Sequence, residues 1–198
     1  MCGRYLLHTD VEAILEHYGI IKGWQYSSWA PEVFPSHEVP VLVMQKEKEL
    51  RPMKWGFPAP PQGRGLIINS RGETVDKRPM FRNAFHSRRC IVPASAFYEW
   101  SGPKGNKTKY QFRIKERPIF SLAGIYDEYF DKEGRPYTAF TILTINPNPM
   151  VSQVHDRMPV ILPREQEEIW LDTALKDISL VKSLIKPYDD AEMEMERA

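Results

Sequence analysis

The chain has 198 residues with a formal net charge of +1, and 42% of its residues are hydrophobic. This length is enough to bury a core without disulfides or metal ions, so we expect one domain over residues 1–198. No apolar run approaches the roughly 20 residues of a membrane-spanning helix, and the first residues lack a signal peptide, which together predict a cytoplasmic protein, nucleoid-associated if bacterial.

The first predicted element is a helix over residues 9–18. Thr9 and Glu12 form a capping box, apolar residues recur at helical spacing, and Gly19 ends the pattern. The stretch 20–38 has no clean period and is predicted to be a loop.

Strands dominate the rest of the prediction. Apolar runs separated by turn residues predict strands at 39–44, 50–55, 66–69, 90–92, 96–100, 110–115, 119–126 and 137–145. Helical patterns predict short helices at 78–88, 163–171 and 178–185. Hairpin-type turns at 102–106 and 131–134 favour antiparallel pairing. The predicted fold class is therefore α+β: a curved, mainly antiparallel sheet or partly closed β-barrel with peripheral helices.

Charge is distributed unevenly along the chain. The C-terminal segment 188–198 is an acidic tail, so the remainder is mildly basic. A basic cluster suits a phosphate backbone, although a solvated charged face is the more common interpretation of such a cluster. Its members are Lys77, Arg78, Arg82, His86, Arg88 and Arg89.

The chain has two cysteines, Cys2 and Cys90. Two thiols cannot form a disulfide framework, and the histidines show no zinc-ligand spacing. We therefore predict no metal site, and nothing in the sequence indicates a cofactor.

Cys2 follows the initiator methionine and is small enough that removal of Met1 is expected. Processing would leave an α-amine with a pKa of about 7.7 to 8.0 beside a thiol with a pKa of about 8.5. Such an aminothiol can form an imine with an aldehyde and then close a five-membered thiazolidine. The alternative is that Cys2 is only a small residue near a chain end.

Three further segments place polar residues within or beside apolar strands. Asn69 and Arg71 end the apolar run 66–68, where an amide could orient an amine and a guanidinium could hold a phosphate. Glu99 lies among aromatic residues, and burial there would raise its pKa toward the range of a general acid or base. His155 and Arg157 flank an acid just before the apolar run 160–162. A turn amide, an outward-facing carboxylate and an isolated histidine are the structural alternatives.

These residues resemble the signature of the SRAP family, the SOS response-associated peptidase domain that shields abasic sites in single-stranded DNA. The resemblance spans residues 2 to about 171 and rests on several ordered motifs. They are Cys2-Gly3-Arg4, Trp55-Gly56, Asn69-Ser70-Arg71-Gly72-Glu73-Thr74, Glu99-Trp100 and His155-Asp156-Arg157-Met158-Pro159.

The resemblance implies a catalytic set. Cys2 would form a thiazolidine with the ring-opened sugar aldehyde, and Asn69 would hold its amine. Glu99 would donate and accept protons, and His155 would shuttle protons to the sugar oxygen. The family further implies lyase-type cleavage, reversal of the crosslink and autoproteolytic processing of Met1.

The resemblance also implies a DNA-binding set. Arg4, Arg71 and Arg157 would bind phosphates, while Trp55 and Phe57 would contact the DNA. The expected partner is single-stranded DNA with abasic sites, with replication or repair proteins as further partners.

Departures from the family pattern and two rival functions remain. Glu32 stands where the family has an amide, the loop after Gly56 lacks the usual wedging aromatics, and the acidic tail replaces a family segment. One rival is a class II glutamine amidotransferase-like amidohydrolase, which also uses an amino-terminal cysteine. The other is a noncatalytic single-stranded DNA-binding module in which Cys2 is incidental.

Overall fold

Five strands pair in a closed ring and form a β-barrel in this computed structural model, which describes residues 2–21, 28–60, 63–103, 105–175 and 177–198. Neighbouring strands of the ring are antiparallel except β4 and β12, which are parallel. The ring consists of β3 (Glu38–Met44), β4 (Lys48–Trp55), β8 (Arg89–Ala94), β11 (Phe120–Phe130) and β12 (Pro136–Ile145). Three short strands extend it: β7 (Asn69–Arg71), β13 (Met158–Pro159) and β14 (Ile161–Leu162).

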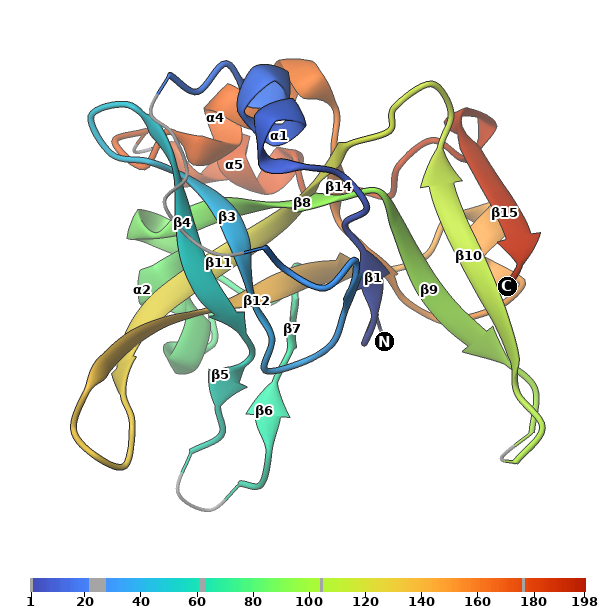
Figure 1. Ribbon diagram of the computed structural model, residues 1–198, viewed down its shortest axis with the longest axis horizontal. Helices are drawn as coiled ribbons and strands as arrows, with labels where there is room; N and C mark the ends of the chain where they lie inside the picture. The colour runs from blue at the N-terminus through green and yellow to red at the C-terminus, as the bar shows by residue number, and fades with distance from the viewer. Residues whose placement is uncertain (1, 22–27, 61–62, 104, 176) are drawn as a thin grey trace.

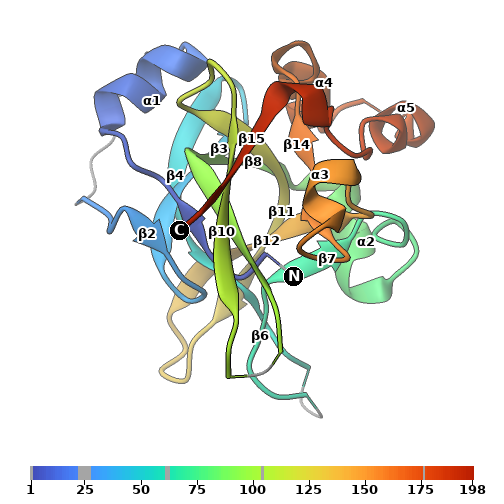
Figure 2. The same cartoon turned by 90° about the vertical axis from the view of Figure 1, so that its right-hand side faces the viewer.

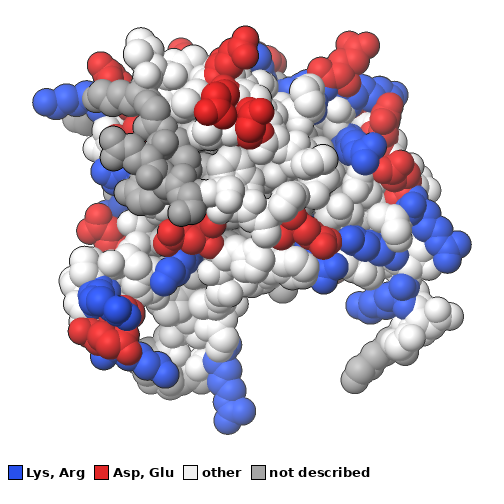
Figure 3. Space-filling view, viewed as in Figure 1, with Lys and Arg blue, Asp and Glu red and all other residues white. Residues whose placement is uncertain are grey.

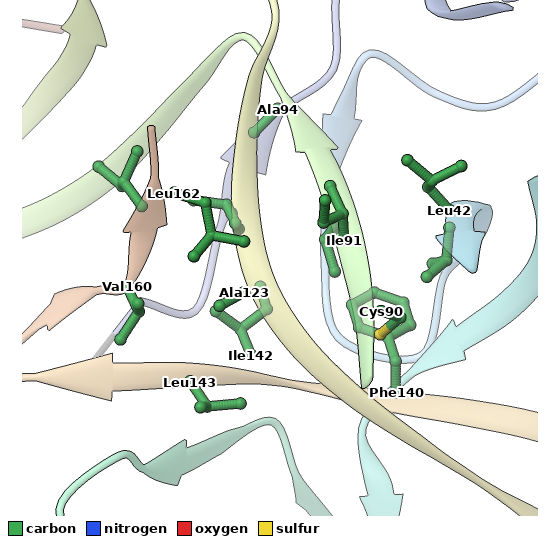
Figure 4. Packing of buried hydrophobic residues seen from close by; sticks show 14 of the residues in the cluster. Leu42, Cys90, Ile91, Ala94, Ala123, Phe140, Ile142, Leu143, Val160 and Leu162 are labelled. Carbon is green, nitrogen blue, oxygen red and sulfur yellow. The ribbon is translucent and has the colours of Figure 1, made fainter. Parts of the chain in front are cut away.

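The barrel strands supply the hydrophobic core. Apolar side chains of β3, β8, β11 and β12 pack together, and Cys90 lies among them beside Phe140 (Figure 4). A Cβ atom at Gly124 would come 2.9 Å from the Cys90 Sγ atom, so a glycine allows β11 to pass close to this thiol. Cys90 is therefore a core residue.

A second, five-stranded sheet packs against the barrel and carries the amino terminus. Its order is β15–β10–β9–β1–β2. The Tyr5 ring of β1 meets the Trp55 ring of β4 edge-on, with 5.2 Å between centroids, which joins this sheet to the barrel. The strands are β1 (Tyr5–Leu6), β2 (Glu32–Val33), β9 (Ala96–Ser101), β10 (Thr108–Ile114) and β15 (Met193–Arg197).

Three of the helices and three of the hairpins occupy opposite ends of the molecule (Figures 1 and 2). Helices α1 (Val11–Tyr18), α4 (Glu167–Leu171) and α5 (Ile178–Ser183) lie at one end. The hairpins β5–β6, β9–β10 and β11–β12 project from the other, and β1 lies between the first two. The remaining elements are β5 (Phe57–Pro58), β6 (Leu66–Ile67), α2 (Pro79–Ser87), α3 (Pro149–Ser152), η1 (Arg164–Gln166) and η2 (Asp190–Glu192).

The α+β fold and most of the predicted elements are confirmed, with four corrections. The α1 N-cap is Asp10, which accepts a 2.8 Å hydrogen bond from the Ala13 backbone, so the predicted capping box is wrong. The predicted loop 20–38 contains β2 and the first residue of β3, while 22–27 lie outside the described residues. The predicted strand 66–69 divides into β6 and β7.

The fourth correction is that the predicted helix 163–171 divides into η1 and α4. The acidic tail, for which no structure was predicted, contains a strand. Residues 193–197 form β15, which pairs antiparallel with β10 and places Met193 opposite Ile114 and Met195 opposite Phe112. Alternate methionines therefore face apolar neighbours while the glutamates between them are exposed. Within the described part of the chain, none of the helices has the length and apolar character needed to cross a membrane.

Candidate active site around Cys2

Cys2 is held at the edge of the barrel immediately before β1. Its side chain has no exposed surface, and its carbonyl oxygen accepts a 2.9 Å hydrogen bond from the Asn69 Nδ2 atom. Burial, and next the charge of Glu99, raise the pKa of the Cys2 thiol well above its usual range. The thiol is therefore protonated at neutral pH.

Asn69 is positioned by the strands of the barrel. It begins β7, which pairs parallel with β12 and places Asn69 opposite Ile142. The Trp55 Nε1 atom donates a 2.9 Å hydrogen bond to the Ile68 carbonyl and so fixes the residue before Asn69. The Asn69 Oδ1 atom is buried and has no hydrogen-bond partner among the described residues. An acceptor in this state is available to a donor that enters the site.

Glu99 faces inward from β9. It lies on the same face of the strand as Phe97, which stacks on Phe112, and the Glu99 residue is only 2% exposed. Burial raises the pKa of the Glu99 carboxyl from 4.5 to about 7. The predicted inward orientation and raised pKa are both confirmed. Near neutral pH this carboxyl is populated in both its acid and its base forms.

His155 meets Glu99 from the loop between α3 and β13. Its Nε2 atom lies 3.8 Å from the Glu99 Oε2 atom, and its Nδ1 atom accepts a 3.0 Å hydrogen bond from the Arg157 backbone. A neutral ring that accepts at Nδ1 carries its proton on Nε2, facing Glu99. Burial lowers the pKa of His155, which favours this neutral form.

Asp156 stabilises the positively charged form of the His155 ring. Its Oδ1 atom lies 3.1 Å from the His155 Nδ1 atom, where it would attract the proton of a charged imidazolium. Cys2, Asn69, Glu99 and His155 thus form one site from four separate segments. The site combines a thiol, an open amide acceptor and two groups able to exchange protons near neutral pH.

Arg4 lies beside this site on the outer face of the five-stranded sheet. Its guanidinium packs over the Phe34 ring at 4.4 Å and the Trp100 ring at 5.0 Å. Glu32 pairs with both Arg4, at 3.4 Å, and Lys109, at 2.8 Å. Glu32 therefore contacts two cations near the site.

Arg157 and Arg71 differ in how their charges are used. The Arg157 side chain is only 11% exposed and pairs with both carboxylate oxygens of Glu73, at 2.5 and 2.8 Å. Arg71 ends β7 with an exposed side chain. Of these two arginines, Arg71 presents the more accessible cation.

Two predicted DNA contacts are wrong, because Trp55 and Phe57 are fully buried. Trp55 supports Asn69 as described, and Phe57 packs against Phe81 and Tyr129 at the base of two hairpins. Their aromatic composition gave no indication of which face of the strand they occupy.

The predicted basic cluster also divides. Arg89 is buried and donates to the carbonyls of Phe85, His86, Trp170 and Asp172, so it joins the C-terminal ends of α2 and α4. Arg88 pairs with Asp127 at 3.1 Å. Four members remain exposed, namely Lys77, Arg78, Arg82 and His86.

The structure adds Glu32 and Glu73 to the residues around the site. Glu73 belongs to the same sequence motif as Asn69, but a single glutamate carries no signal that it pairs with an arginine 84 positions away. Within the described residues, no three His, Cys, Asp or Glu side chains gather in a way that could hold a metal ion.

The surface near the amino terminus is concave and carries basic residues at its sides. The molecule is hollowed between the β5–β6 and β9–β10 hairpins, and Lys and Arg side chains lie on both projecting arms (Figure 3). Strand β1, which begins three residues after Cys2, lies between these two hairpins (Figure 1). An extended anionic chain could therefore approach the site from this side.

Comparison with known proteins places these features in a family. The model of the family "SOS response associated peptidase (SRAP)" matches residues 1–198. The abasic site processing protein YoqW of Bacillus subtilis is 35% identical over 98% of this chain and 90% of its own length. The abasic site processing protein YoaM of the same species is 34% identical over 98% of this chain and 89% of its own length.

Solved structures share the fold. A protein from Bacteroides thetaiotaomicron superposes with a TM-score of 0.83 at 28% identity, covering 99% of this chain and 91% of that one. A protein from Bordetella bronchiseptica gives the same TM-score at 24% identity, covering 100% and 99% of the two chains, and supports the fold alone.

Proposed function

Because the chain belongs to the SRAP family, we propose that it processes abasic sites in single-stranded DNA by capturing the sugar aldehyde on Cys2. The observation that carries this proposal is the convergence of Asn69, Glu99 and His155 on Cys2. The names of the relatives, which describe abasic site processing, support the substrate class.

Removal of Met1 is the first requirement. While Met1 is attached, the Cys2 nitrogen is an amide, and an amide cannot form an imine. Processing converts it into an amine with a pKa of about 7.7 to 8.0, which has a nucleophilic fraction at neutral pH. The buried Oδ1 atom of Asn69, on the side chain that already holds the Cys2 carbonyl, is a suitable acceptor for this amine.

Capture then proceeds in two covalent steps. The amine adds to the aldehyde carbon, and loss of one water gives an imine. The Cys2 sulfur next bonds to the imine carbon, and the thiol proton passes to the imine nitrogen, which closes the thiazolidine. Since the thiol pKa is raised, sulfur attack depends on a group that accepts its proton.

Glu99 and His155 have the properties to move these protons. Glu99, with a pKa of about 7, can protonate the hydroxyl of the amine–aldehyde adduct, so that it leaves as water, and can accept the thiol proton. The neutral His155 ring presents its Nε2 proton toward Glu99 and can relay protons to the sugar oxygen. An imine formed before ring closure also permits strand cleavage by elimination, so lyase activity belongs to the same proposal.

Binding of the DNA backbone is assigned to cations beside the site. Arg71 is exposed two residues after Asn69, and Arg4 lies on the sheet that carries Glu99. Arg157 adds positive charge next to His155, although Glu73 neutralises much of it. Phosphate contacts of this kind position the strand without reading its sequence.

A denaturing gel tests the proposal. Protein with Met1 removed, verified by mass, is mixed with single-stranded DNA that bears one abasic site. We expect a heat-stable shifted band with this strand and none with an undamaged strand. Cys2→Ala should abolish the band, while Cys90→Ala, which changes the buried core thiol, should retain it.

The rival functions give different results. A salt-labile and denaturant-labile complex in place of the band would favour the noncatalytic binding module. Release of ammonia from glutamine by the processed protein would favour the amidohydrolase. Absence of a covalent band with fully processed protein would overturn the proposal.

A further inference from the structure

The orientation of His155 depends on a hydrogen bond to its own loop. The Arg157 backbone N–H donates to the His155 Nδ1 atom at 3.0 Å and leaves the Nε2 proton facing Glu99. If the loop shifts, Nδ1 loses this donor and the ring can adopt its other tautomer. The Arg157 main chain therefore favours a ring with its proton on Nε2 and opposes the Asp156 Oδ1 atom, which lies 3.1 Å from Nδ1 and attracts a proton there.

The Arg157 side chain anchors this part of the main chain. Its Nη1 and Nη2 atoms form the paired bonds to Glu73, and Nη1 also donates to the Asn146 Oδ1 atom at 3.0 Å. Nη2 donates to the Thr144 carbonyl at 2.7 Å. The bidentate pair with Glu73 is the strongest of these contacts, because both partners are charged and both oxygens are engaged.

Glu73 lies in the segment that also carries Asn69. The Gly72 backbone N–H donates to the Thr144 carbonyl at 2.8 Å, the same oxygen that accepts from Arg157. Strand β12, which contains Thr144, pairs with β7 on one side and β13 on the other. The segment 69–73 thus binds the Cys2 carbonyl through its first residue and the Arg157 guanidinium through its last residue.

We propose that Glu73 is a positioning residue for His155, which acts by anchoring Arg157 so that the Nε2 proton of His155 faces Glu99. Glu73 does not touch the reacting atoms. Its effect is on the tautomer of the ring and on its distance from Glu99. The inference rests on the proposed function for its catalytic consequence, but the tautomer itself is a property of the protein without DNA.

Several charged groups act on the His155 ring and must be held constant in a test. They are Glu99 from β9, Asp156 from the same loop, Lys107 from the β9–β10 turn and, once Met1 is removed, the Cys2 amine. None of these is altered by a change at Glu73, but Glu73 itself offsets the charge of Arg157 beside the ring. Loss of this charge alone shifts the His155 titration, so the tautomer of the ring, and not its titration, reports the loss of positioning.

Nitrogen NMR of the histidine rings tests the proposal on the full-length, Met1-processed protein without DNA. In the wild type we expect His155 to carry its proton on Nε2 and to titrate below 6.5. Glu73→Ala should populate both tautomers. Glu73→Gln keeps one oxygen to accept from Arg157 and should give an intermediate result.

Kinetics provide the second readout. Glu73→Ala should slow crosslinking by on the order of 10-fold to 100-fold through misplacement of His155 and should change its pH dependence. The matched control is Glu168→Ala, which removes an exposed glutamate paired with Lys48 at 2.8 Å and should change neither readout.

The outcomes separate this inference from the proposed function. A folded Glu73→Ala protein with the wild-type tautomer would overturn the inference, as would an equal effect of Glu168→Ala. Absence of crosslinking by the wild type would overturn the proposed function and leave the tautomer measurement valid.

Discussion

Replacing Glu99 by glutamine should change how the stability of the protein depends on pH. Burial raises the pKa of the Glu99 carboxyl from 4.5 to about 7, so the folded state binds this proton more tightly than the unfolded state. The resulting stabilisation is fully present below pH 4.5 and is lost as the pH rises to the folded pKa and beyond. The shift corresponds to about 3 kcal/mol at about 1.4 kcal/mol per pKa unit.

Glutamine fills a similar volume and does not ionise, so Glu99→Gln lacks this pH-dependent contribution to stability. We expect the stability of the wild type relative to Glu99→Gln to fall by about 3 kcal/mol between pH 4.5 and pH 8. Urea unfolding of both proteins at several pH values measures the difference directly. A difference that stays constant within about 1 kcal/mol across this range would refute the assigned burial and pKa of Glu99.

Three further perturbations test other parts of the account. Asn69→Ala removes the hydrogen bond to the Cys2 carbonyl, so crosslinking should slow by about tenfold while undamaged strands still bind in gel shifts. An equal loss of crosslinking and of binding would contradict the role of Asn69 in positioning Cys2. Glu32→Gln releases Arg4 and Lys109 from their ion pairs, so single-stranded DNA should bind more tightly. In anisotropy titrations, the plot of log binding constant against log salt concentration should become steeper by up to about 1.4, and an unchanged slope would show that these two cations do not contact the DNA. Gly72→Ala places a Cβ atom 2.3 Å from the Ile185 Cγ2 atom and should lower the stability of the fold by about 1 to 3 kcal/mol in thermal melts. The loss should be smaller when Ile185 is also replaced by alanine, and additive effects of the two substitutions would argue against this contact.

Sequence patterns predicted the chemistry of the site better than its geometry. Glu99 could be placed on the inward face because it alternates with Phe97, and the structure confirms that orientation. The pairing of β7 with β12 could not be predicted, because parallel contacts between segments about 70 residues apart leave no local period. That pairing is what brings Asn69 to Cys2.

Errors of prediction arose where the side of the strand on which a residue lies was not considered. Trp55 and Phe57 were expected at the DNA from the resemblance to the family, yet their rings fill the core. The acidic tail was interpreted from its charge, although the alternation of Met193 and Met195 with glutamates is the period of a half-buried strand. Composition thus outweighed periodicity for the tail, where periodicity was the better guide.

The most direct test of the central claim is the chemical nature of the bond between Cys2 and the abasic site. Intact mass spectrometry of the purified adduct, before and after borohydride, distinguishes a thiazolidine from an imine. We predict a mass equal to protein plus DNA less one water, located on the Cys2 peptide and unchanged by borohydride, because the sulfur has already saturated the imine carbon. An adduct that gains two hydrogens, or one attached at a lysine, would contradict capture by the Cys2 aminothiol.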